Sequence, residues 1–201
     1  MKRIVILALL AMALPLASFA SSSVYFTNGG GVLLGSSEGM SLTGSELIAV
    51  NGLSGELVVG ALGSLSFSTG SLISGGSLQM GGSFNGGGNF TIIGNGSFGI
   101  PDETIFTGSF SGPVTWTLIT LANGTHNYTL TGSITGAWYN GAAVQGATVQ
   151  LTINTGKGYF NESTNVSGGG TNIVVPEPDT LGLLGTGLIG LAGALHRKSK
   201  A

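Results

Sequence analysis

The chain of 201 residues is 42% hydrophobic and only 7% charged, and it contains 38 glycines and no cysteine. About a quarter of the residues of an ordinary soluble domain are charged, so this composition is unusual for a cytoplasmic protein. The lack of cysteine excludes a disulfide scaffold and a thiol nucleophile, and the scarcity of Lys and Arg argues against a nucleic-acid-binding protein.

The N-terminus has the features of a secretory signal peptide. Two basic residues precede an apolar run over 4–14, and small side chains follow at Ser18 and Ala20. Signal peptidase requires small residues at these two positions. We therefore expect residues 1–20 to be a signal peptide that is cleaved after Ala20, so that the mature chain is exported.

Residues 21–160 are predicted to form one β-rich extracellular domain. Long helices are disfavoured because glycine costs a helix interior about 1 kcal/mol relative to alanine. Short runs of Thr, Val, Ile and aromatic residues alternate with polar residues, which favours half-buried strands. We expect an all-β fold, an antiparallel sandwich or barrel-like domain rich in Gly, Ser and Thr, with about ten strands. In the N-terminal half, glycine clusters at 29–31 and 86–88 predict that the strands are short.

The strongest local signal is a hairpin around the Asn-Gly pair at 123–124. A two-residue loop would place apolar side chains opposite polar ones. A three-residue loop instead pairs Trp116 with Leu130 and Leu118 with Tyr128, which creates one apolar face. We predict this second register, with the turn glycine in the left-handed conformation.

A second turn at 140–141 is expected to join strands over 134–139 and 144–153. Trp138 and Tyr139 are neighbours in the first of these strands, so only one of them can face the core. The other is a candidate for stacking on a sugar ring. Trp116 and Tyr128 are expected in the core.

The sequence offers few groups for catalysis. His126 is the only histidine between the two ends of the chain, and its place beside a turn predicts an exposed side chain. Asp102 and Glu103 are adjacent, so in an extended chain they point to opposite faces and cannot act across one bond. With one histidine and no cysteine, a zinc site is disfavoured. We expect no enzyme activity, no cofactor and no metal.

Residues 161–174 are polar and contain three consecutive glycines, a composition that predicts a flexible linker. Val175, Pro176, Glu177 and Pro178 follow, then an uncharged apolar run over 181–195 and a basic cluster at the C-terminus. As a helix this run is about 22 Å long, short of the ~30 Å hydrocarbon core, so it spans a membrane only marginally.

This order of features resembles the PEP-CTERM sorting signal of proteins exported by bacteria with two membranes. The resemblance covers the tail, residues 175–201, and leaves the central domain unassigned. It implies that an exosortase recognises the Val-Pro-Glu-Pro segment, that 181–195 enters the inner membrane transiently, and that the protein reaches the cell envelope, the cell surface or the extracellular space.

These observations favour a surface or extracellular-matrix protein with a non-enzymatic structural or interaction role, associated with exopolysaccharide or biofilm. Its expected partners are signal peptidase, exosortase, the membrane and polysaccharide, and no nucleic acid. One alternative is a carbohydrate-binding or adhesive module that uses exposed aromatic residues. A second alternative is an extracellular hydrolase of an unrecognised type.

Overall fold

The computed structural model describes residues 22–53 and 55–175. Within these ranges it shows strands β1 to β12 and a short 3-10 helix, η2 (Ser97–Gly99). The strand pairs are antiparallel, which confirms the predicted all-β antiparallel class. The predicted signal-peptide helix and the predicted membrane helix over 181–195 lie outside the described residues.

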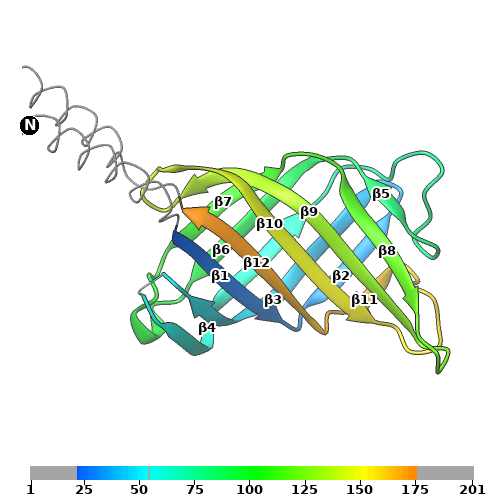
Figure 1. Ribbon diagram of the computed structural model, residues 1–201, viewed down its shortest axis with the longest axis horizontal. Coiled ribbons are helices and arrows are strands. Elements are labelled where there is room, and N and C mark those ends of the chain that lie inside the picture. Colours follow the sequence, from blue (N-terminus) through cyan, green and yellow to red (C-terminus); the bar gives the residue numbers. More distant parts are fainter. Residues whose placement is uncertain (1–21, 54, 176–201) are drawn as a thin grey trace, which may run out of the picture. The chain divides into compact units, whose positions relative to one another are not determined.

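Eight strands form a closed barrel, because β1 pairs with β12 on one side and with β3 on the other (Figure 1). Around the barrel the order is β1 (Ser22–Gly29), β12 (Gly168–Val175), β10 (Ala143–Asn154), β9 (His126–Trp138), β7 (Thr104–Phe110), β6 (Gly87–Gly94), β4 (Leu57–Ser68) and β3 (Gly39–Asn51).

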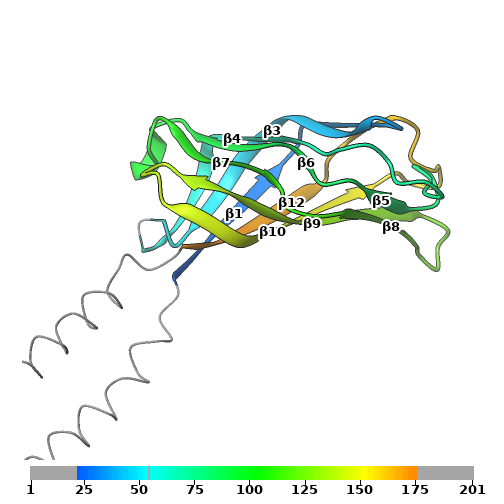
Figure 2. The ribbon, with the colours of Figure 1, turned by 90° about the horizontal axis from the view of Figure 1, so that it is seen from above.

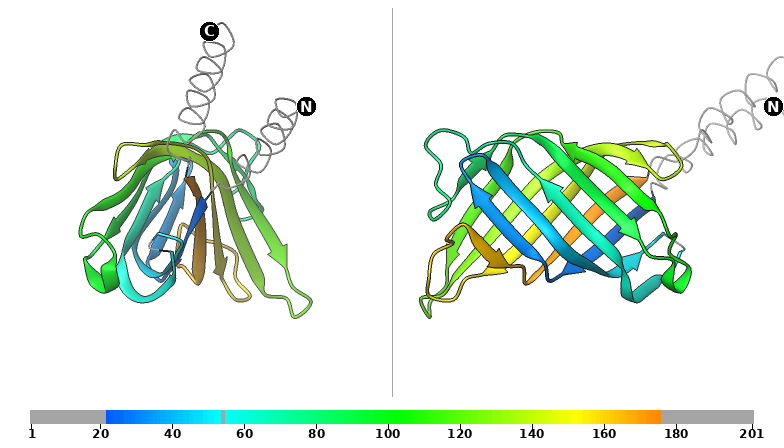
Figure 3. Two further views of the ribbon diagram at one scale, coloured as in Figure 1. Left: turned by 60° about the vertical axis from the view of Figure 1, so that its left-hand side comes forward. Right: turned by 180° about the vertical axis from the view of Figure 1, so that it is seen from behind.

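Two long strands change partners along their length. The first residues of β3 pair with β2, and its last residues pair with β1. Likewise, the first residues of β9 pair with β8, and its last residues pair with β7. Beyond these points the sheet continues as two facing layers (Figure 2). The additional strands are β2 (Val32–Ser36), β11 (Ser163–Asn165), β5 (Gly82–Phe84) and β8 (Val114–Thr120). The domain is therefore an eight-stranded barrel with four additional strands, which confirms the barrel-like form of the predicted fold (Figure 3).

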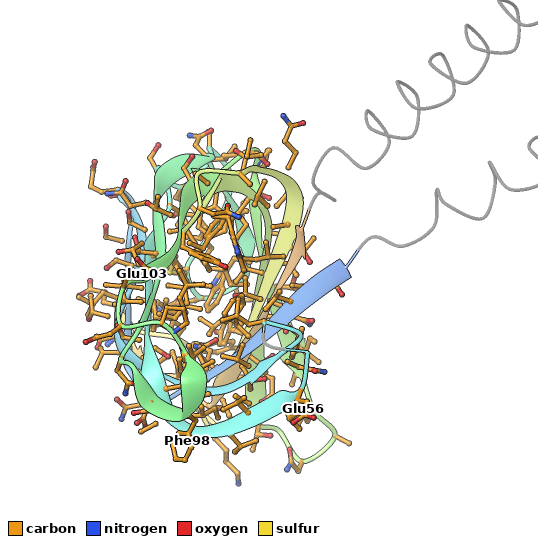
Figure 4. All side chains as sticks on the ribbon, turned by 90° about the vertical axis from the view of Figure 1, so that its left-hand side faces the viewer. Glu56, Phe98 and Glu103 are labelled. Atoms are coloured by element: carbon orange, nitrogen blue, oxygen red, sulfur yellow. The ribbon has the colours of Figure 1, made fainter. Side chains whose placement is uncertain are left out.

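Aromatic side chains fill the space between the strands. Phe67 packs edge-on against Phe110 with ring centroids 5.6 Å apart, and Phe90 packs edge-on against Phe106 at 6.1 Å. Burial of each such side chain contributes about 1.5–3 kcal/mol. Figure 4 looks into the barrel end of the domain and shows side chains occupying the interior.

The predicted hairpin is confirmed in its register. Trp116 lies opposite Leu130 and Leu118 lies opposite Tyr128. Gly124 has a φ of 78°, the left-handed conformation expected of the turn. The turn at 140–141 is also present, closed by the N–H of Trp138 donating to the carbonyl of Ala142 at 2.9 Å. However, the predicted strand over 134–139 is not a separate element, because residues up to Trp138 continue strand β9, which begins at His126.

The prediction of short strands in the N-terminal half is confirmed for β2 and β5, with five and three residues, and is wrong for β3 and β4. β3 has 13 residues and β4 has 12 residues. Glycines lie inside these strands without ending them, because the register shifts between Leu42 and Ser45 and again between Leu47 and Ala49. Gly44, at the first shift, has a φ of 66°. Such bulges absorb a positive φ and leave the ladder intact on both sides.

The prediction of a flexible linker over 161–174 is also wrong. This segment contains β11 and most of β12, and β12 pairs with β10 from Gly168 to Asn172. Glycine in a strand is tolerated where another side chain covers it, and Tyr25 covers Gly170. The compact unit therefore extends over 23–174 and not to 160 as predicted.

Candidate functional site

The titratable side chains are dispersed over the domain. Residues 22–53 and 55–175 contain no group of three or more His, Cys, Asp and Glu side chains that could hold a metal ion. Asp102 and Glu103 are exposed in the turn before β7, and Glu103 lies at the rim of the barrel in Figure 4.

His126 is buried, with 7% of its surface exposed, so the prediction of an exposed histidine is wrong. The Tyr159 ring stacks on the imidazole with centroids 4.3 Å apart, and Thr120 Oγ1 lies 3.1 Å from Nδ1. The backbone of His126 also accepts from Thr155 and donates to Gly156. The turn after β10 thus folds over the histidine, and these contacts give His126 a structural role at the start of β9.

Trp116 and Tyr128 lie in the core, as expected, with 1% and 0% of their surfaces exposed. The Tyr128 hydroxyl donates to the carbonyl of Gln79 at 2.7 Å and accepts from the N–H of Phe160 at 3.1 Å. Burial raises the pKa of Tyr128, and the Phe160 N–H partly opposes this by stabilising the phenolate.

Trp138 and Tyr139 differ in burial, although their ring centroids lie 6.0 Å apart. Trp138 is 6% exposed and packs against Phe26 and Phe106, with ring centroids 6.0 and 6.4 Å away. Tyr139 is 49% exposed at the end of β9. Of the two candidate contact residues, Tyr139 is therefore the one whose ring solvent and ligands can reach.

A groove that the sequence did not indicate lies on the outer face of the barrel. It encloses about 410 Å³ and is lined by Tyr25 of β1, by Gln150 and Thr152 of β10, and by residues 167–170. Its floor is the backbone of β12, since Gly168 and Gly170 have no side chains. Alternation in β1 could have indicated that Tyr25 faces outward, but no local signal placed it beside Gly170. We call this feature the Tyr25 groove.

Two rows of polar side chains continue from the Tyr25 groove across neighbouring strands. One row is Gln150 of β10, Thr131 of β9 and Thr115 of β8; the other is Thr152, Thr129 and Thr117 of the same strands. These residues lie on the outer face, because the residue between them in each strand is buried in the core: Trp116 in β8, Leu130 in β9 and Leu151 in β10. We call them the threonine rows. Together they give the face a regular array of hydroxyl groups ending in one amide.

A strained aromatic residue lies at the barrel end seen in Figure 4. Phe98 in η2 has a φ of 54° and is 71% exposed. A Cβ atom on Gly60 of β4 would come within 3.0 Å of its ring. Glycine at this position therefore lets the ring lie close against β4.

The described part of the chain ends where the sorting segment begins. β12 ends at Val175, which is also the first residue of the Val-Pro-Glu-Pro sequence. Residues 174–198 match the family model of the PEP-CTERM protein-sorting motif. The chain carries a PEP-CTERM sorting motif. No curated protein and no solved structure matches the chain significantly.

The PEP-CTERM motif identifies the chain as an exported protein that an exosortase sorts to the cell surface. Pro176, Glu177 and Pro178 of the motif lie outside the described residues, as do the predicted cleavage residues Ser18 and Ala20. In the part of the chain that the structure describes, no helix is long and apolar enough to cross a membrane.

Proposed function

We propose that the protein is a surface or extracellular-matrix protein whose β domain has a structural or binding role and not a catalytic one. The observation that carries the proposal is the PEP-CTERM motif, which begins within the last two residues of strand β12. The engaged, buried His126 and the dispersed carboxylates support the non-enzymatic part.

A carbohydrate-binding or adhesive role is the second candidate. It is favoured by exposed aromatic rings on an outer surface that is otherwise rich in hydroxyl and amide groups. Tyr25 and Tyr139 are two such rings, with 48% and 49% of their surfaces accessible. Aromatic faces stack on the apolar faces of sugars, and neighbouring amides and hydroxyls bond their polar edges.

The full-length chain, with an epitope tag inserted in the exposed turn at 122–124, is to be expressed in a host with an exosortase and in the same host lacking it. We expect tagged protein without its basic tail at the cell surface or in the medium of the first host only. Glu177→Ala should reduce this release, and Glu103→Ala, a change of an exposed carboxylate outside the motif, should not. Equal size and location in both hosts would contradict the proposal.

The non-enzymatic part is tested on the released protein. Incubation with soluble polysaccharides should leave the number of reducing ends unchanged over a day. A steady increase that scales with protein concentration would show hydrolysis and would favour the hydrolase alternative.

A further inference from the structure

The Tyr25 groove and the threonine rows form one surface across five neighbouring strands, β1, β12, β10, β9 and β8 (Figure 1). We infer that this surface binds a neutral polysaccharide chain, with one sugar ring stacked on Tyr25. The inference depends on the proposed function, because it requires a protein that is exported to where such polymers occur.

The Tyr25 ring has the geometry of a stacking platform. A Cβ atom on Gly170 would lie 2.7 Å from Cζ of Tyr25, so the ring lies against the backbone of β12 at this glycine. With 48% of its surface exposed, the side chain still offers aromatic surface to a ligand. A ring held in this way loses little conformational freedom when it binds.

Gly168 keeps the hollow beside Tyr25 open although packing does not require a glycine there. The nearest atom to a Cβ atom at this position is the carbonyl oxygen of Asn28, 3.7 Å away, which is an ordinary contact. At Gly170, in contrast, any side chain would collide with Tyr25. A side chain at Gly168 would fit the strand but would occupy the floor of the groove.

The threonine rows provide the polar half of the recognition. Gln150 lies opposite Gly170 and Thr152 opposite Gly168, so both rows begin at the groove. Hydroxyls and amides donate and accept hydrogen bonds, which suits sugar hydroxyls. Five strands spaced about 4.8 Å apart give a track about 19 Å long, enough for several sugar units to lie across the strands.

Charge selects the class of polymer. The residues of the groove and of both rows are uncharged, whereas residues 21–175 together carry one lysine and six carboxylates, a net charge of −5. A polymer of uronic acids would be repelled by this domain and would find no cation in the groove. A neutral polysaccharide is not repelled by the domain and needs no cation in the groove.

The experiment is affinity electrophoresis of the exported full chain, as released by the host, in native gels containing dextran, galactomannan or xylan, with alginate as the anionic comparison. We expect at least one neutral polymer to retard the protein and alginate not to retard it. Tyr25→Ala should raise the dissociation constant at least tenfold, and Tyr25→Phe should retain most of the binding because the stacking face remains.

Gly168→Val tests the floor of the groove with a residue that favours strands. It should abolish retardation while leaving the melting temperature unchanged. Phe98→Gly removes an exposed ring that lies outside the groove and the rows, and this variant should bind like the wild type. For the rows, Thr131→Val should weaken binding several-fold, and Thr91→Val on β6 should not.

Three results would overturn the inference: no retardation by any of the three neutral polymers, unchanged binding in Tyr25→Ala, or retardation by alginate alone. If the protein is exported and yields one of these results, the proposed surface function still holds and only the saccharide site is wrong. If the protein is not exported, the proposed function fails first.

Discussion

The rings of Trp116 and Tyr128 stack nearly parallel, with centroids 4.8 Å apart and planes inclined by 14°, and both side chains donate to the same loop. Trp116 Nε1 donates to the carbonyl of Leu78 at 2.8 Å, and the Tyr128 hydroxyl donates to that of Gln79 at 2.7 Å. The loop between β4 and β5 is thereby held against the β8–β9 hairpin, although the bonded residues are 38 and 49 positions apart in the sequence.

Tyr128→Phe should loosen this loop without emptying the core. The ring stays, but the buried N–H of Phe160 loses its acceptor and Gln79 loses its donor. An unsatisfied buried donor costs about 1–3 kcal/mol, so the free energy of unfolding should fall by this amount. Denaturant titration measures the loss, and thermolysin should cleave near Leu78 sooner than in the wild type. Tyr139→Phe, at an exposed ring, is the control and should change neither quantity.

Alkaline pH should destabilise the domain through the same residue. Burial raises the pKa of Tyr128 above its ordinary value of 10.0. The folded state therefore holds this proton more tightly, and the stabilisation is complete below the unfolded pKa and is lost as pH rises through the folded one. The free energy of unfolding should decrease as the pH rises above about 10, less steeply in Tyr128→Phe than in the wild type. Equal slopes in the two proteins would contradict a contribution from Tyr128.

Local patterns predicted the β8–β9 hairpin well because its register depends on neighbours in sequence. The pairing of Trp116 with Leu130 follows from turn length and from the requirement that apolar residues share a face. The prediction that only one of Trp138 and Tyr139 faces the core rested on the same local reasoning, and Trp138 is the one that is buried. Such constraints operate within one hairpin, where the two paired residues are close together in the sequence.

Glycine misled the prediction wherever its role depended on a distant strand. Residues 168–170 suggest a linker by composition, yet their conformation is fixed by β10 and by Tyr25, which is adjacent in space but far away in the sequence. His126 was expected to be exposed, and it is buried by Tyr159, which comes 33 residues later. For the same reason the Tyr25 groove, made by three separate segments, had no local signature.

Gly136→Ala should be strongly destabilising, because Gly136 faces Gly108 where β7 and β9 come close together. A Cβ atom at Gly136 would lie 2.6 Å from Cα of Gly108 and 2.8 Å from Cζ of Phe106. Forcing an extra carbon into such a contact typically costs about 1–3 kcal/mol. Gly112→Ala is the matched control, since no atom lies within 4 Å of its added Cβ atom. Thermal unfolding should separate the two variants, and equal melting temperatures would contradict the close approach.

Phe98 should be replaceable by glycine with no loss of stability. Its φ of 54° places a bulky residue in the left-handed region, where a non-glycine residue costs of order 1–3 kcal/mol. Because the side chain is 71% exposed, little buried surface is lost when it is removed. Phe98→Gly relieves the strain and should leave the free energy of unfolding unchanged or raise it by up to about 1 kcal/mol, although glycine also increases the entropy of the unfolded chain.

Phe98→Val gives the opposite expectation, since a β-branched side chain tolerates a positive φ least of all. It should lower the free energy of unfolding, so the two variants bracket the wild type in a denaturant titration. If Phe98→Gly proved the less stable of the two, the contact of the ring with β4 at Gly60 would outweigh the backbone strain. Phe98 would then be a packing residue of the barrel end, held in its conformation by that contact.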